Sequence, residues 1–166
     1  MTVLRYLLVL CAFGCAASLA AAQADVRIEP AHLDGPRQLG EETQAAAVRD
    51  YLQSWQSFEA AFAQNQAALL DADFVGNARD KLSAAIAQQA ALGIRTRYQD
   101  RAHDLRIVFY SPEGLSIELT DAVEYAVQVF DHGRLAATET EHARYIVVLT
   151  PSEVRWRVRV FQATPE

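Results

Sequence analysis

The sequence predicts an α+β domain in which two or three N-terminal helices pack on a curved four-stranded antiparallel meander, an αα(α)ββββ cone fold. Between residues 105 and 162 apolar and polar side chains alternate, which is the period of strands with one buried face. Residues 41–92 instead repeat apolar side chains every three or four positions, as amphipathic helices do. Short segments that contain Gly or Pro divide the alternating stretch into four strands.

The first 24 residues have the features of a secretory signal peptide. A short basic start at Arg5 precedes an apolar run over residues 6–20, and Ala22-Gln23-Ala24 forms an A-x-A cleavage site. We therefore expect cleavage before Asp25 and a periplasmic or secreted mature protein. Two alternatives stay open, an uncleaved membrane anchor and a lipoprotein modified at Cys15.

Composition limits the chemistry of the mature chain. Both cysteines, Cys11 and Cys15, lie in the signal segment, so cleavage leaves no disulfide, no thiol nucleophile and no cysteine metal site. The rest of the chain holds 14 basic and 21 acidic side chains, a net charge of about −7, which argues against a nucleic-acid partner. The four histidines are scattered without metal-ligand spacing, so we expect no metal and no cofactor.

A single domain is expected over residues 41–166, after an extended leader over residues 25–40 that contains two Pro and two Gly. Glu41 to Gln64 is predicted to form an amphipathic helix whose acidic start suits the positive end of the helix dipole. Its apolar stripe consists of Val48, Tyr51, Leu52, Trp55, Phe58 and Phe62. We interpret this stripe as core packing, with a ligand-binding box as the alternative.

A second long helix is expected from Asn77 to Leu92, after a single helical turn over Ala67–Leu70. Gly93 then suits a helix C-cap, and the following segment, Ile94 to Asp104, enters the sheet. The apolar residues change from even to odd positions within this segment. A bulge or a break is therefore expected near Arg101 to Asp104.

The turns suggest how the four strands pair. Pro112-Glu113-Gly114 and Asp131-His132-Gly133 resemble three-residue hairpin loops with Gly in the left-handed position, and a third turn surrounds Pro151-Ser152. The predicted pairs include Leu105–Asp121, Phe109–Ile117, Tyr125–Glu139, Val123–Glu141, Leu149–Val154 and Val147–Trp156. These registers keep the apolar residues of all four strands on one face.

Polar side chains interrupt the apolar inner face of the predicted sheet. Asp121, Glu139 and Glu141 lie there, and His103 joins them if the first strand keeps its phase. A curved sheet covered by helices can enclose a pocket, in which carboxylates become able to act as acid or base. The candidate pocket, which would take a small apolar ligand, comprises Tyr51, His103, Asp121, Tyr125, Glu139 and Glu141. The alternative is that these carboxylates are solvated or structural.

The outer face of the predicted sheet mixes apolar and charged residues and is a candidate surface for a homodimer or a cell-envelope protein partner. The candidate interface residues are Tyr110, Ile146, Val148 and Arg157. Arg155, Arg157 and Arg159 form a row of every second residue, for which a solvated face with cross-strand ion pairs is the alternative. A membrane contact is expected only through the N-terminal segment, if that segment is not cleaved.

Three segments carry a family resemblance: AVRDYLQSW (47–55), ALLDADFVGNARDKL (68–82) and VRWRVRVF (154–161). Together with helices followed by a curved sheet, they resemble the nuclear transport factor 2-like superfamily, the cystatin-like cone fold that includes SnoaL-like proteins, in an exported bacterial form. The order of elements is also similar to periplasmic domains of type IV secretion components and to Mce-associated proteins. The resemblance covers about residues 41–162.

The resemblance implies a fold but no single activity, because the superfamily includes isomerases, cyclases, dehydratases, ligand carriers and scaffolds without catalysis. Ketosteroid isomerase-like members place a Tyr on the first helix and acidic residues in the cone, and Tyr51 and Asp121 resemble these. Cone-fold relatives often dimerise through the outer sheet face. We expect a non-catalytic binding or scaffold module of the cell envelope, with a small-molecule-binding protein or a SnoaL-like or isomerase-like enzyme as the alternative.

Overall fold

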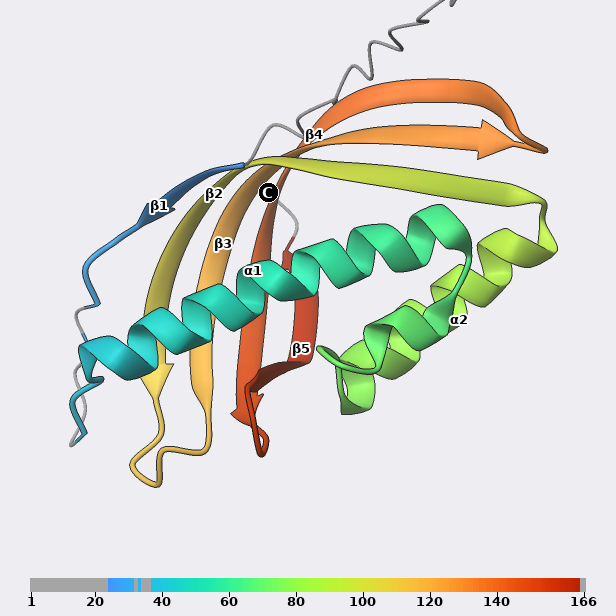
Figure 1. Ribbon diagram of the computed structural model, residues 1–166. Helices are drawn as coiled ribbons and strands as arrows, with labels where there is room; N and C mark the ends of the chain where they lie inside the picture. The colour runs from blue at the N-terminus through green and yellow to red at the C-terminus, as the bar shows by residue number, and fades with distance from the viewer. Residues whose placement is uncertain (1–23, 32, 34–36, 165–166) are drawn as a thin grey trace, which may run out of the picture.

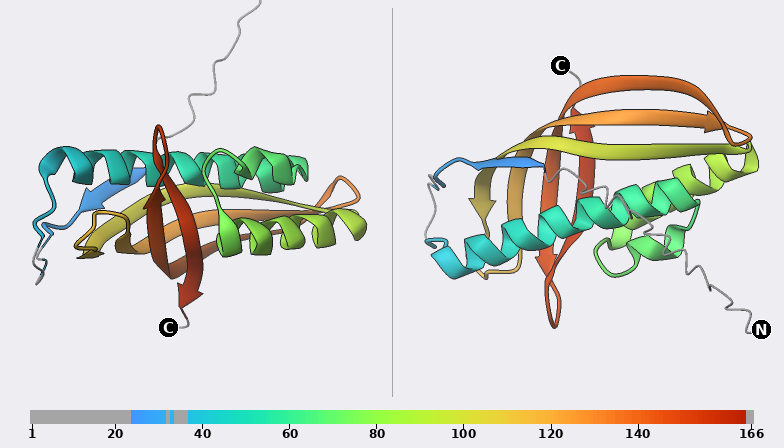
Figure 2. Two further views of the ribbon diagram at one scale, coloured as in Figure 1. Left: turned by 90° about the horizontal axis from the view of Figure 1, so that it is seen from below. Right: turned by 45° about the horizontal axis from the view of Figure 1, so that its top comes forward.

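The computed structural model describes residues 24–31, 33 and 37–164, so the predictions for residues 1–23 lie outside the described part of the chain. Two helices lie on the concave side of one bent sheet (Figures 1 and 2). The elements are β1 (Asp25–Ile28), α1 (Glu41–Gln64), the 3-10 helix η1 (Ala67–Leu70), α2 (Gly76–Ala91), β2 (Ile94–Tyr110), β3 (Ile117–Asp131), β4 (Arg134–Pro151) and β5 (Trp156–Thr164). The α+β prediction is confirmed.

The sheet has five strands rather than the predicted four, in the order β1-β2-β3-β4-β5. The additional strand, β1, comes from the predicted leader and runs parallel to β2, with Asp25 beside Ala102 and Ile28 beside Leu105. A strand of four residues is too short to show a period of two, and its partner lies far away in the sequence. The sheet is therefore mixed, although β2 to β5 form the predicted antiparallel meander.

The helices follow the predicted pattern closely. The bounds of α1 are those predicted, and α2 begins and ends one residue earlier than expected. Gly93 has a φ of +69°, the left-handed conformation that a glycine after a helix end supplies. The apolar stripe of α1 packs on the sheet, where Tyr51 and Trp55 are almost fully buried. The helix thus covers the middle of the concave face.

Bulges decide which side chains face inwards on β2. Leu105 pairs with Asp121 as predicted, and one bulge lies between Asp100 and Ala102, where a break was expected. A second bulge, between Ile107 and Phe109, was not expected. It pairs Phe109 with Glu118 instead of Ile117 and leaves the phenylalanine side chain 46% exposed on the outer face.

The other two registers differ from the prediction. Tyr125 pairs with Glu141 rather than Glu139, because a tight turn at His132-Gly133 and a bulge next to Val129 together shift the pairing by two residues. A shift of two keeps every side chain on its predicted face. Leu149 pairs with Val158 rather than Val154, because residues 152–155 form a wider loop in which the Ser152 hydroxyl bonds to the Arg155 carbonyl. Val147 accordingly pairs with Phe161 rather than Trp156.

Two arginines at the start of β5, Arg155 just before the strand and Arg157 within it, bond to the loop between η1 and α2. Arg155 donates to the Asp73 carboxylate at 2.8 Å, and Arg157 donates to the backbone carbonyls of Asp71 and Phe74. The Phe74 backbone also pairs in parallel with Val158. Arg157 thus bonds to this loop, and its role in an outer interface stays a prediction.

Candidate functional site

A buried polar network lies where α1 crosses the sheet. Asp121 of β3 accepts two hydrogen bonds on one carboxylate oxygen, Oδ2, from the Tyr51 hydroxyl at 2.6 Å and from His103 Nδ1 at 2.7 Å. Asp121 and Tyr51 are fully buried, and His103 is 2% exposed. Three side chains from α1, β2 and β3 are thus joined through a single carboxylate inside the cone.

The network continues in both directions from this centre. The indole Nε1 of Trp55 donates to the Tyr51 hydroxyl at 2.8 Å. On the other side, His103 Nε2 lies 3.2 Å from the Asp100 carboxylate. Glu59 of α1 then accepts a hydrogen bond from the Asp100 backbone amide at 2.8 Å. The network therefore runs from the fully buried Asp121 to the partly exposed pair Asp100 and Glu59.

The hydrogen-bond geometry around His103 favours its positively charged form. Each of its ring nitrogens faces a carboxylate oxygen, Asp121 on one side and Asp100 on the other. Ionised carboxylates only accept hydrogen bonds, so both contacts need an N–H, and only the imidazolium has two. If both carboxylates are ionised, the His103 ring is a buried cation between two anions.

The pKa shifts agree with this assignment. Burial lowers the pKa of His103, but the hydrogen bonds and charges of Asp100 and Asp121 raise it by more, to about 9. The hydrogen bond to His103 lowers the pKa of Asp100. Burial raises the pKa of Glu59 to about 7, and burial together with the charge of Asp121 holds the pKa of Tyr51 well above its usual range.

Aromatic rings fill the concave interior beside this network. The indole of Trp55 contacts five other rings, with centroid distances from 5.2 to 5.9 Å. These rings belong to Phe58, His103, Tyr125, Tyr145 and Phe161. A hollow of about 810 Å³ lies instead on the outer face of the sheet, around Asp104, Glu124 and Arg144. The protein's own aromatic side chains therefore occupy the part of the concave interior around Trp55.

The structure brings together only part of the predicted pocket. Tyr51, His103 and Asp121 meet, and Tyr125 is half-buried against Trp55. Glu139 and Glu141 do not join them, because this part of β4 is exposed to solvent. Arg101 is also exposed, at the bulge, with its guanidinium 3.6 Å from Glu124.

Sequence reasoning missed Glu59, Asp100 and the hydrogen-bonding role of Trp55. A signal for Glu59 was present, because it follows Trp55 by four residues and so lies on the same side of the helix. Among the described residues, no group of His, Cys, Asp or Glu side chains has the arrangement of a metal site. The network can hold and share a proton, and Asp121 Oδ1 is its one buried side-chain atom without a hydrogen-bond partner among the described residues.

The fold, by contrast with the sequence, has known counterparts. No protein-family model and no curated protein matches this sequence. The intermembrane space region of the chloroplast protein ARC6 superposes with a TM-score of 0.61 at 15% identity, covering 78% of this chain and 100% of that one. A candidate scytalone dehydratase from Novosphingobium aromaticivorans gives 0.53 at 12% identity, covering 76% and 89%.

A third solved structure is similar as well. Aln2 from a Streptomyces species superposes with a TM-score of 0.50 at 13% identity, covering 77% of this chain and 94% of that one. Identities this low show a shared fold and leave the activity open. With helices packed on the concave side of a bent meander, this chain shares its fold with these three solved structures.

Proposed function

We propose that the domain is a non-catalytic binding or scaffold module that acts through the outer face of its sheet. The observation that carries this proposal is the packed interior. Aromatic rings surround Trp55, and the reactive groups of the buried network face one another instead of a cavity. A substrate would have to displace these rings, whereas a protein partner needs only an accessible surface.

The outer face offers such a surface near the end of the sheet where β2 turns into β3. The unexpected bulge turns Phe109 outwards, and the register aligns it across the sheet with Glu118, Val148 and Val160. Val108 is 40% exposed. We call the apolar side chains of this region the outer apolar patch. The outer apolar patch consists of Val108, Phe109, Ile146, Val148 and Val160.

A second copy of the domain fits this patch. An apolar surface bordered by polar groups is typical of protein interfaces. Glu118 lies within the row, and Arg144 lies on the outer face two residues along β4 from Ile146, so two copies can pair opposite charges around their apolar centres. Of the predicted interface residues, Ile146 and Val148 belong to this patch, whereas Tyr110 is 8% exposed and packs in the core.

We expect the mature domain, residues 25–166, to sediment as a dimer and its Ile146→Glu and Phe109→Glu variants to sediment as monomers. A carboxylate placed in an apolar contact must lose its hydration, which opposes association. Leu135→Glu is the matched control, because Leu135 is 55% exposed at the β3–β4 turn, away from the patch. A parent domain that is monomeric at every concentration would contradict self-association.

A second candidate function is a small-molecule-binding protein or a SnoaL-like or isomerase-like enzyme. One observation favours it: Asp121 Oδ1 has no hydrogen-bond partner among the described residues, although it belongs to a buried carboxylate beside an imidazolium. Such a pair could hold or transfer a proton if the rings moved apart. A ligand that co-purifies with the domain and is lost from an Asp121 variant would support this candidate.

We further propose that the domain works in the cell envelope after signal-peptide cleavage. Cleavage before Asp25 would leave β1 whole, because β1 begins at Asp25. No described helix is both long enough and apolar enough to cross a membrane. Intact-mass measurement of the protein from the cell-envelope fraction should give an N-terminus at Asp25. A protein that retains Met1 would contradict cleavage, and a lipid mass on Cys15 would indicate a lipoprotein.

A further inference from the structure

We propose that a hollow between α1 and the β4–β5 turn binds the carboxylate of an apolar organic acid. The hollow measures about 370 Å³, and neither the buried network nor the outer apolar patch contributes to it. It is lined by Arg49, Asp50, Gln53, Val154 and Arg155. The proposal is therefore independent of the function proposed above.

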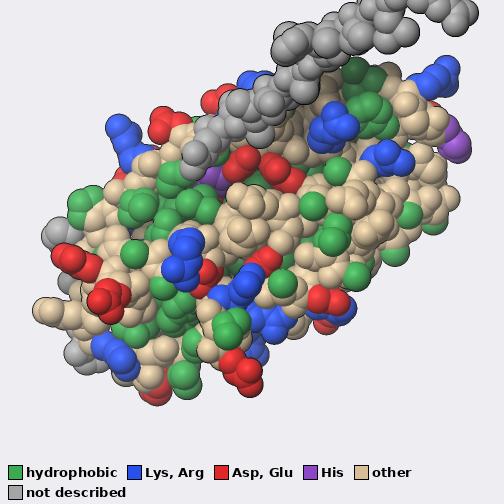
Figure 3. Space-filling view, in the orientation of Figure 1, with side chains coloured by type: hydrophobic (Ala, Val, Ile, Leu, Met, Phe, Trp, Pro, Cys, Tyr) green, Lys and Arg blue, Asp and Glu red, His purple; other side chains and the backbone are tan. Residues whose placement is uncertain are grey.

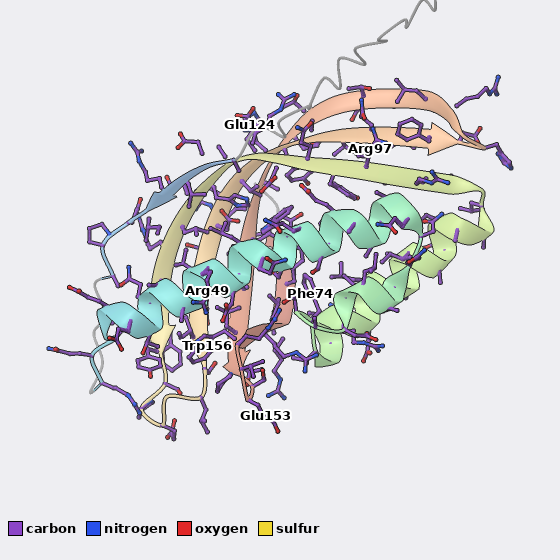
Figure 4. The ribbon with its side chains drawn as sticks, in the orientation of Figure 1. Arg49, Phe74, Arg97, Glu124, Glu153 and Trp156 are labelled. Carbon is purple, nitrogen blue, oxygen red and sulfur yellow. The ribbon has the colours of Figure 1, made fainter. Side chains whose placement is uncertain are left out.

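Two guanidinium groups of the hollow are fixed by buried carboxylates. Arg49 donates from Nε and one terminal nitrogen to Asp50 Oδ1, at 3.0 and 2.9 Å, and Asp50 is 7% exposed. The other oxygen of Asp50 accepts the Trp156 backbone amide at 2.8 Å, which anchors this carboxylate to β5. Arg49 on α1 and Trp156 at the start of β5 are labelled in Figure 4.

Arg155 is held in the same manner from the other wall. Its Nη1 donates to Asp73 Oδ1 at 2.8 Å, and Asp73 is 2% exposed. The second oxygen of Asp73 accepts the Ser57 hydroxyl at 2.5 Å. Both carboxylates are thus occupied on both oxygens, so they orient the two arginines and retain little capacity to bind a ligand themselves.

The arginines retain donors for a ligand. No described residue accepts a hydrogen bond from Arg49 Nη1, or from Arg155 Nε or Nη2. The side chains are 71% and 38% exposed, so solvent and solutes reach them. Two guanidinium groups with free donors thus line one hollow, and arginine binds carboxylates with charge-assisted hydrogen bonds.

The surroundings select an acid with an apolar part. Val154, which is 81% exposed, is the one apolar side chain among the residues that line the hollow. Basic side chains gather in the middle of this face of an otherwise acidic protein (Figure 3). Glu153, the acidic residue of the same turn, lies towards its tip, at a distance from Arg49 (Figure 4). An organic acid with an apolar chain can bind the arginines through its carboxylate and contact Val154 through its chain.

The test uses the mature domain and three probes of defined chemistry: hexanoate, hexan-1-ol and inorganic phosphate. We expect hexanoate to give saturable shifts in the NMR signals of Gln53 and Val154, and hexan-1-ol and phosphate to bind at least about tenfold more weakly. Arg49→Gln should weaken hexanoate binding by about tenfold or more, since it removes charge-assisted hydrogen bonds. Val154→Ser should weaken it by a smaller factor.

Arg97→Gln is the matched control. Arg97, on β2, is not among the residues that line the hollow, and its guanidinium lies over the Phe130 ring. Its hexanoate affinity should equal that of the parent. Because Arg49 is largely exposed, its variant should fold, which the NMR spectrum itself reports. The proposal is overturned if hexanoate gives no saturable shift or binds Arg49→Gln as tightly as the parent. Phosphate binding as tight as that of hexanoate would overturn the choice of an apolar acid.

Discussion

Replacing Asp121 with asparagine is expected to lower the free energy of unfolding by about 3–5 kcal/mol, the cost of breaking a buried ion pair by removing one partner. Asp121 is fully buried and accepts hydrogen bonds from both Tyr51 and His103. Asparagine has the same shape but no charge, so it leaves the His103 imidazolium in the interior with one carboxylate instead of two. Urea denaturation of the parent and the variant at neutral pH measures the difference.

Glu141→Gln is the matched control for this experiment. Glu141 lies on the same inner face of the sheet, paired with Tyr125, but it is exposed. Removing its charge should change the free energy of unfolding by no more than about 0.5 kcal/mol. If Asp121→Asn is as stable as the parent, the network does not hold the cone together. If that stable variant also no longer binds a co-purifying ligand, the result supports the second candidate function.

The sequence predicted those parts of the fold that repeat over many residues. The bounds of α1 could be predicted because its stripe extends over several turns, and Tyr51 lies in that stripe. The pairing of Leu105 with Asp121 was correct for a less direct reason. The first hairpin loop is longer than predicted, and the bulge at Val108 compensates for the difference before the chain reaches Leu105.

The sequence indicated the bulge near Arg101 through a change of apolar phase, but it did not indicate the other single-residue irregularities of the sheet. A bulge adds one residue without changing the composition of a strand, so nothing in the alternation marked Phe109 as an outward-facing side chain. The same limit applies to Phe161, which was not assigned to the inner face but stacks on Tyr145 at 4.5 Å and helps to fill the cone. The sequence therefore left undecided whether the cone holds a pocket, and Phe161, which the register of β5 aligns with Val147, helps to fill it.

The centre of the candidate site was easier to predict than its ends. His103 and Asp121 stand out because they interrupt an apolar face, and Tyr51 because it lies in an apolar stripe that faces them. Glu59 and Asp100 lie at the border between buried and exposed positions, where a charged residue is ordinary. Only the contacts of their backbone and side chains connect them with His103.

The stability of the domain is expected to fall as the pH rises from about 6.5 to about 9. The folded state raises the pKa of His103 to about 9, above the ordinary value of 6.5. A group with a raised pKa binds its proton more tightly in the folded chain, so its contribution is complete below pH 6.5 and is lost as the pH rises through 9. Since each pKa unit corresponds to 1.36 kcal/mol, the loss is on the order of 3 kcal/mol.

Glu59 and Asp100, the neighbours of His103, determine how the free energy of unfolding changes with pH below about 7. The raised pKa of Glu59, about 7, adds a loss of stability with the same sign between about pH 4.5 and 7. The lowered pKa of Asp100 has the opposite sign, so its contribution is present above its ordinary pKa and is lost as the pH falls below it. The free energy of unfolding should therefore be greatest near pH 4 to 5, which is lower than in most domains.

Urea denaturation at a series of pH values, with two variants, separates these contributions. His103→Gln should be less stable than the parent at neutral pH but should lose the decline between pH 7 and 9. Glu59→Gln should keep that decline and lose the one between pH 4.5 and 7, because its amide does not titrate. A parent profile that is flat from pH 6.5 to 9 would mean that His103 is neutral in the folded protein. Either Asp100 or Asp121 would then have to carry a proton, since a neutral imidazole can donate a hydrogen bond to only one of them.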